Sequence, residues 1–345
     1  MSLEERPLEK YVHWFLVDKL KNEGEKLWTK YQGTRNEIVS EVLPWIAKHG
    51  GGLTDHGVEH IADVIDNAAL LLGFQNHYED SFSNQPAHGF SPHEMLVLLA
   101  GLLLHDVGNI YGRDRHNQKI GEVWSKLNSW PTWADNEKML IIDVGRAHSG
   151  KGPDGSKDTL KSLTLTPRYF GKYPIRPAPI AAVIRFADEL AEGDQRTSHF
   201  LISNNLIEEG STLYHHYASI TEVSPDRAHG RVALTYHINI DNSNYPQDPE
   251  NLKSHLCALL KMVYARAAKM NYERQFARHY ADILVPFRET SISLTFIKNG
   301  ATLDLPLEPI IINDIIGSSE SSELIVQLNE NYTIEKLVNS AMSVQ

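Results

Sequence analysis

The 345-residue chain predicts a mainly α-helical fold with a small β insertion and a small C-terminal α+β segment. Up to about residue 192, apolar side chains recur at the spacing of helices that bury one face. Residues 231–240 (RVALTYHINI) instead place an apolar side chain at every second position, as a half-buried strand does. Asn299-Gly300, a dipeptide typical of tight hairpin turns, separates two further strand-like stretches.

These signals divide the chain into four predicted segments. Residues 1–198 form a helical core, residues 199–245 a β-hairpin or small sheet, residues 246–285 helices that return to the core, and residues 286–345 a C-terminal α+β segment. Residues 211–221 show a weaker alternation, so the sequence predicts that they are extended as well.

Composition excludes several classes of protein. Lys+Arg 33 against Asp+Glu 44 gives a net charge of -11, which excludes a surface built throughout to neutralise nucleic-acid phosphates. One cysteine cannot form an internal disulfide or a cysteine-based zinc cage. The longest apolar run, residues 95–104 (MLVLLAGLLL), is about half the length of a membrane span. We therefore expect a cytoplasmic protein without a membrane segment.

Four polar residues fall where burial is predicted. His60 and Asp188 lie on the apolar stripes of two separate helices, and His105-Asp106 directly follows the apolar run 95–104. Burying an ionised carboxylate without a partner costs several kcal/mol or more. A divalent metal ion bound by His60, His105, Asp106 and Asp188 satisfies all four groups at once.

The same residues carry a family resemblance. The stretches HIADV from His60, LLLHDVGN around His105-Asp106 and RFADEL around Asp188 resemble, in order and spacing, the HD superfamily of metal-dependent phosphohydrolases over roughly residues 50–192. The resemblance implies an HD-type helical bundle in which metal-activated water attacks a phosphorus centre. Because the ligands are imidazole and carboxylate groups, we expect a divalent transition metal, namely Mn, Fe, Co, Ni or Zn.

Two further histidines extend the predicted site. His148 lies on an apolar stripe, and His116 follows shortly after the His105-Asp106 pair. In HD proteins with two metals, extra histidines bind the second ion, so the resemblance implies that role for His116 and His148. Either ring could instead protonate the leaving group, while Asp106 orients the nucleophile or bridges two metals. The number of ions, one or two, stays open.

Local charge predicts the class of substrate. Residues 111–185 carry 13 Lys or Arg and 7 Asp or Glu, a local excess of +6 (13 minus 7) within an acidic chain. Cations beside the site suit phosphate oxygens. We therefore expect a phosphorylated small molecule, a nucleotide, cyclic nucleotide or short oligonucleotide, bound by Arg113, Arg115, Lys119, Arg146 and Lys151.

Other functions fit parts of the sequence. A catalytically weak HD module could bind a nucleotide signal and relay it to a protein partner. A nuclease on short single strands would use Arg113 and Arg115. His56, Glu59 and His60 also fit the H-x-x-E-H pattern of a zinc peptidase, which leaves Asp106 and Asp188 unexplained. A homo-oligomer stays open.

Overall fold

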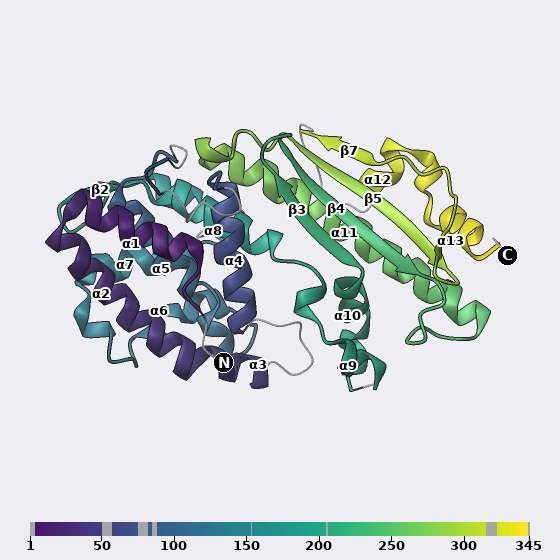
Figure 1. Cartoon of the computed structure of the whole chain (residues 1–345), viewed down its shortest axis with the longest axis horizontal. Coiled ribbons are helices and arrows are strands. Elements are labelled where there is room, and N and C mark those ends of the chain that lie inside the picture. The colour runs from purple at the N-terminus through teal and green to yellow at the C-terminus, as the bar shows by residue number, and fades with distance from the viewer. Residues whose placement is uncertain are drawn as a thin grey trace. The chain divides into compact units, whose positions relative to one another are not determined.

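The protein is represented by a computed structural model that describes residues 4–49, 57–74, 82–84, 88–152, 154–204, 206–314 and 323–343 (Figure 1). The chain divides into two compact units. The first contains the described residues up to Ala191 together with Ala277–Val285, and the second contains Glu192–Phe276 and the described residues from Pro286 onward. The predicted fold class, mainly α with small β segments, is confirmed. The four-segment division drawn from the sequence stays a prediction.

Helices make up most of the first unit. They are α1 (Pro7–Leu20), α2 (Asn22–Glu37), a π-helical turn (Ile38–Val42), α3 (Leu43–His49), α4 (Val58–Leu71), α5 (Pro92–Leu104), α6 (Ile120–Trp124), α7 (Asp135–Arg146) and α8 (Pro177–Leu190). Short 3-10 turns connect them at Phe82–Asn84, Val107–Tyr111, His116–Lys119, Trp130–Thr132, Lys161–Thr164 and Asp282–Leu284. The strands β1 (Arg168–Phe170) and β2 (Tyr173–Ile175) form an antiparallel hairpin before α8.

Helix α5 is the centre of the first unit. It packs against α1, α4, α7 and α8 (Figure 1). Every residue from His93 to Leu104 is buried. The stretch Pro92–Tyr111 is long and apolar enough to be a candidate membrane span, but 89% of that window is buried in the fold. Gly101 lets its neighbours approach closely, because an added Cβ would lie 2.5 Å from Ile184 Cδ1 and 3.1 Å from Val144 Cγ2.

An ion pair between the buried carboxylate of Glu94 and the half-exposed side chain of Arg176 anchors the beginnings of α5 and α8 together. Ser91 caps α5 by accepting the Glu94 N–H at 3.2 Å, while Glu94 Oε2 accepts the Ser91 N–H at 2.8 Å. The other Glu94 oxygen accepts both the backbone N–H and the Nε–H of Arg176, at 3.0 and 2.8 Å, directly before α8. The two helices therefore start side by side, which fixes the positions of their far ends.

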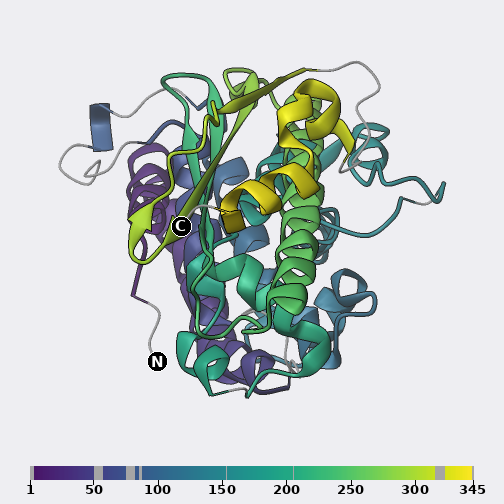
Figure 2. The same cartoon turned by 90° about the vertical axis from the view of Figure 1, so that its right-hand side faces the viewer.

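The second unit is a sheet with helices. Its helices are α9 (His199–Ser203), α10 (Thr212–Ser219), α11 (Pro249–Tyr280), α12 (Glu323–Leu328) and α13 (Ile334–Ser343), with 3-10 turns at Asp194–Arg196, Glu209–Ser211 and Glu330–Tyr332. Its strands are β3 (Thr221–Asp226), β4 (Arg231–Asn239), β5 (Glu289–Lys298), β6 (Ala301–Thr302) and β7 (Ile310–Asn313). The strand order is β3-β4-β5-β6, and β7 also pairs with β5. Helix α11 connects the parallel strands β4 and β5 and runs alongside the sheet (Figure 2).

The predicted alternation is correct for one segment and wrong for another. In β4 the side chains at every second position are buried, as residues 231–240 predicted. Residues 212–219 instead form helix α10, in which His215, His216, Tyr217 and Ala218 are buried in succession. So short a window of mixed apolar and polar residues fits both a strand and a helix, and the helix prevails because the hairpin begins only at Thr221.

Candidate metal centre

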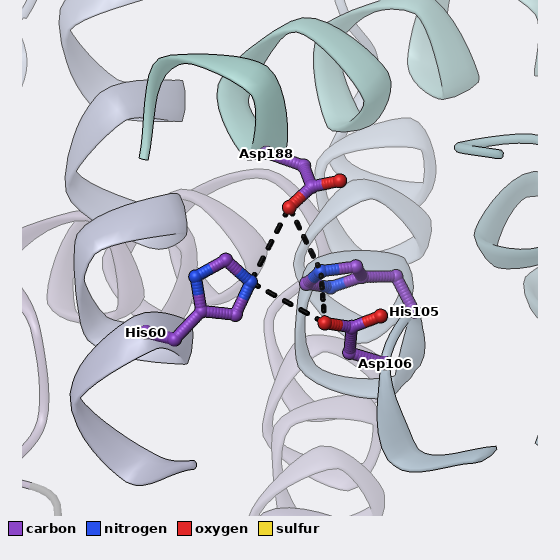
Figure 3. Close-up of side chains that lie close together, drawn as sticks. All are labelled: His60, His105, Asp106 and Asp188. Carbon is purple, nitrogen blue, oxygen red and sulfur yellow. Dashed lines mark ion pairs between the residues drawn. The ribbon is translucent and has the colours of Figure 1, made fainter. Parts of the chain in front are cut away.

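Three helix ends bring together the four residues predicted to bind a metal. His60 projects from the first turn of α4, His105 and Asp106 directly follow α5, and Asp188 lies in the last turn of α8 (Figure 3). His60 Nε2 lies 3.4 Å from Asp106 Oδ2 and 3.3 Å from Asp188 Oδ1. His105 Nε2 lies 3.7 and 3.6 Å from the same two oxygens. Two imidazole nitrogens and two carboxylate oxygens thus converge on one point.

The His105 ring shows that this point suits a cation. Its Nδ1 pairs with the Leu102 carbonyl at 2.8 Å and therefore carries the proton, which leaves Nε2 as the lone-pair nitrogen of the neutral ring. Nε2 is buried and makes no hydrogen bond within the described residues. Although burial opposes it, the carboxylates of Asp106 and Asp188 raise the pKa of His105 to about 9. The neighbourhood therefore favours positive charge at this nitrogen.

Asp106 faces a second group of ligands with its other oxygen. Asp106 Oδ1 lies 3.2 Å from His116 Nε2 and 3.5 Å from His148 Nε2. All three residues are at least largely buried, His148 and Asp106 almost completely. The carboxylate thus has one oxygen in each of two ligand groups, the arrangement of a bridging ligand.

The histidines of the second group face each other with their acceptor nitrogens. His116 Nδ1 pairs with the Arg113 carbonyl at 3.0 Å, and His148 Nδ1 pairs with the Gly145 carbonyl at 2.6 Å. Carbonyls only accept, so both Nδ1 atoms carry protons and both neutral rings present lone pairs at Nε2. Those two Nε2 atoms lie 3.1 Å apart. Two lone pairs and a carboxylate oxygen at this separation repel one another unless a proton or a metal ion lies among them.

The spacing of both groups matches the spacing of metal ligands. Bonds of about 2.1 Å at angles between tetrahedral and octahedral place neighbouring ligand atoms about 3.0–3.4 Å apart. The closest separations are 3.3 Å in the first group and 3.1 Å in the second. The clustered histidine and aspartate residues can therefore bind divalent metal ions, in one group of four and one group of three that share Asp106.

The surroundings of Asp188 and His148 keep both side chains in the protonation states that metal ligands need. Burial raises the pKa of a carboxyl group, yet the rings of His105 and His60 hold the pKa of Asp188 well below its usual value. Burial also lowers the pKa of His148, so that ring is neutral at physiological pH. A metal ion requires carboxylates without protons and neutral imidazoles, and Asp188 and His148 meet these conditions before any metal binds, whereas His105 must lose a proton.

A glycine allows His116 to reach the centre. The chain turns back after the Val107–Tyr111 turn, and the His116 carbonyl comes so close to Gly108 that an added Cβ would overlap it. Arg115 takes the left-handed conformation, with φ of 51°, at this reversal. The short separation along the chain between Asp106 and His116 is therefore no obstacle to shared ligation.

The basic residues predicted to bind substrate fall into two sets. Arg113 and Arg115 are exposed in the turn before His116, and Lys119 pairs with Glu122 at 3.1 Å on the surface. Arg146 and Lys151 line a cavity of about 600 Å³ beside the second ligand group. Of the five predicted residues, Arg146 and Lys151 thus line this cavity.

Two residues of the site were not predicted from the sequence. Asn109, one 3-10 turn after Asp106, is buried, and neither amide atom has a hydrogen-bond partner within the described residues. Arg168 lines the cavity with Arg146 and Lys151. Asn109 could have been noticed as a polar residue inside the quoted stretch LLLHDVGN, whereas nothing in the sequence around Arg168 signals its position.

The alternative peptidase pattern cannot be assembled from the described residues. His56 lies outside them, Glu59 is exposed, and His60 faces Asp106 and Asp188. Glu59 therefore does not join this centre as a base.

A comparison with known protein families identifies a domain that contains all of these residues. A family model described as HD-CE matches residues 51–260, more than half of the chain and all six residues of the two ligand groups. No curated protein and no solved structure matches the chain.

Proposed function

Because the chain belongs to the HD-CE family, in agreement with the resemblance of its motifs to HD phosphohydrolases, we propose that it is a metal-dependent phosphohydrolase. Its HD-type domain with clustered histidine and aspartate ligands is typical of a metal-dependent hydrolase. The proposed reaction is cleavage of a phosphoester or phosphoanhydride bond in a nucleotide, cyclic nucleotide or short oligonucleotide. We place this activity in the cytoplasm, because one cysteine among 345 residues is typical of a reducing compartment.

The position of Asp106 carries the proposal. One of its oxygens faces His60 and the other faces His116 and His148. Two divalent ions held there would polarise a phosphoryl oxygen and acidify the attacking water. Asp106 would help to hold both ions, since it offers one oxygen to each ligand group.

The same geometry supports ligation by His116 and His148. The Nδ1–H of each ring donates a hydrogen bond to a backbone carbonyl, and Nε2 lies toward Asp106 Oδ1. Neither neutral ring has an N–H left for the oxygen of a leaving group. We therefore propose both as ligands of a second ion rather than as general acids.

The charge around the centre supports a phosphorylated substrate. Arg146 and Lys151 in the cavity wall, with Arg113, Arg115 and Lys119 on the adjoining surface, supply cations for phosphate oxygens. Two neighbouring divalent ions also suit the hydrolysis of a phosphate ester, since they can stabilise both the attacking and the leaving oxygen.

Hydrolysis by the purified protein tests the proposal. The full chain, supplied with Mn, Co or Fe, is assayed on bis-p-nitrophenyl phosphate, nucleoside mono-, di- and triphosphates and cyclic nucleotides. We expect at least one substrate to be cleaved by the wild type and by Asp114→Asn, whose carboxylate is 94% exposed, but not by Asp106→Asn. Equal rates for wild type and Asp106→Asn on every substrate would refute the hydrolase and leave a nucleotide-binding module.

A further inference from the structure

We propose that the cavity beside the second ligand group binds a chain of phosphates that continues from the phosphate under attack, so that the substrate is a nucleotide with several phosphates. This inference rests on the proposed function, because it assigns the reacting phosphate to the metal centre. It adds the chemical class of the substrate and a role for Arg168.

The cavity borders the metal centre through the neighbours of its ligands. Asn117 follows His116, and Ala147 and Ser149 flank His148, and all three line the cavity. Ser149 Oγ lies 3.5 Å from His116 Nε2. A molecule in the cavity is therefore within a side chain's length of the second ligand group.

Hydrogen bonds make this wall a fixed structure. The Asn117 amide donates to the carbonyls of Arg146 and Ser149, at 3.0 and 2.8 Å. The Thr159 hydroxyl, which also lines the cavity, donates to the Ala147 carbonyl at 2.5 Å and accepts from the Arg185 guanidinium at 3.0 Å. The cavity is thus built from segments that are linked to α7 and α8, the helices that lead to His148 and Asp188.

The lining of the cavity carries excess positive charge. Arg146, Lys151 and Arg168 line it with a single acid among the described residues, Asp143. Asp143 Oδ2 pairs with one terminal nitrogen of Arg168 at 3.2 Å, which leaves a net charge of +2 (three bases minus one acid). This excess of two positive charges favours an anion in the cavity, and arginine suits the oxygens of phosphate.

Arg168 has a donor that nothing in the described chain satisfies. Its Nε is buried and has no hydrogen-bond partner within the described residues, although the same guanidinium reaches Asp143. A buried N–H of a charged group without an acceptor is unfavourable. Because 36% of the Arg168 side chain is exposed and the residue lines the cavity, an oxygen of a ligand there can accept from the guanidinium, and a small shift of the side chain would bring Nε to it as well.

The volume of the cavity sets the size of the ligand. About 600 Å³ falls within the range of small-molecule sites and exceeds what one phosphate fills. If the metal ions hold the reacting phosphate, the cations of the cavity need further phosphates of the same molecule. A nucleoside triphosphate meets both conditions, whereas a nucleoside monophosphate leaves the cavity cations without a partner.

Binding of ATP (as a non-hydrolysable analogue), AMP and adenosine to the full chain saturated with Mn, measured by calorimetry, tests the inference. We expect ATP to bind at least about tenfold more tightly than AMP and adenosine not to bind. Arg168→Gln should weaken ATP binding about tenfold to a hundredfold, since hydrogen bonds to charged groups are lost. Lys161→Gln is the matched control, because it removes the same charge from an exposed position next to the lining residue Ser162.

Three results would overturn the inference: equal affinity for ATP and AMP, no binding of ATP, or equal weakening by Arg168→Gln and Lys161→Gln. If Arg168→Gln does not fold, Arg146→Gln replaces it, because Arg146 is exposed and also lines the cavity. Failure of the proposed function looks different. In that case ATP would bind in an Arg168-dependent way, but no phosphate bond would be hydrolysed. The cavity assignment alone would be refuted if Asp106→Asn loses hydrolysis while Arg168→Gln keeps an unchanged affinity for ATP.

Discussion

The Nε2 atoms of His116 and His148 lie 3.1 Å apart, although each ring carries its proton on Nδ1. Each Nδ1–H donates a hydrogen bond to a backbone carbonyl. A hydrogen bond between them would require one ring to be doubly protonated, and burial lowers the pKa of His148. A divalent ion among these nitrogens and Asp106 Oδ1 resolves the repulsion. We therefore propose a second ion among these two rings and Asp106 Oδ1, in addition to an ion in the group around His60.

Removing one of these rings should impair hydrolysis without unfolding the protein. In His148→Ala the second group keeps only His116 and Asp106, so we expect the metal-dependent rate to fall about a hundredfold or more, as several kcal/mol of charge stabilisation is lost. Steady-state rates on bis-p-nitrophenyl phosphate measure the effect. His229→Ala, which removes an exposed histidine of the second unit, serves as control. A full rate in His148→Ala would contradict the role of the second group.

Substituting one glycine should remove His116 from the centre. Gly108→Ala places a Cβ against the backbone carbonyl of His116, and backbone cannot move aside as a flexible side chain can. The turn that carries His116 must shift, and we expect the loss of one ion with the group around His60 retained. Gly33→Ala is the control, because nothing lies within 4 Å of its added Cβ and alanine favours the helix by about 1 kcal/mol. An unchanged metal content in Gly108→Ala would show that the turn does not position a ligand.

Metal affinity should rise with pH. Because Asp106 and Asp188 outweigh the effect of burial and raise the pKa of His105 to about 9, this ring holds an extra proton at neutral pH in the metal-free protein. A metal ion must displace that proton, so its apparent affinity should increase about tenfold per pH unit up to about pH 9 and then level off. Calorimetry in buffers of different ionisation enthalpy measures both the affinity and the proton released. Affinity that does not change between pH 6 and pH 9 would contradict ligation by His105.

The ion pair at the start of α5 should contribute to stability only above acidic pH. Burial raises the pKa of Glu94, but Arg176 and the backbone N–H groups outweigh it and lower the pKa below its ordinary value of 4.5. Glu94→Gln should therefore cost about 2–3 kcal/mol at neutral pH, and the difference from wild type should shrink as pH falls through that lowered pKa.

Urea unfolding of both proteins at several pH values measures this difference. Glu122→Gln is the control, because its carboxylate is 45% exposed and pairs with Lys119 on the surface, where such pairs contribute at most about 1 kcal/mol. A cost for Glu94→Gln as small as that of the control would mean that the pair does not anchor the two helices.

The sequence allowed four ligands to be predicted because each interrupts an apolar pattern. His60 and Asp188 lie on buried helix stripes, and His105-Asp106 ends a helix with no exposed face. The proximity of His116 depends instead on a chain reversal at Gly108 and Arg115, which no periodic pattern records. A local turn of this kind is set by backbone geometry and by what packs against it.

Which strands pair with one another across long stretches of sequence could not be predicted from such local patterns. The alternation of residues 231–240 predicts a strand but not its parallel partner, since Arg231 pairs with Glu289 only after the whole of α11 intervenes. The cavity is similar, because Asn117, Arg146 and Arg168 come from three separate segments. Sequence patterns within one element identify which face is buried, and tertiary packing decides which faces meet.

The number of metal ions bound per chain tests the central claim most directly. Elemental analysis of the purified protein after saturation with Mn or Co and removal of free ions should give two ions per chain for the wild type, one for His148→Ala and fewer than one for Asp106→Asn, because Asp106 belongs to both groups. A wild type that binds no metal, or a metal content that is the same in all three proteins, would contradict a centre bridged by Asp106.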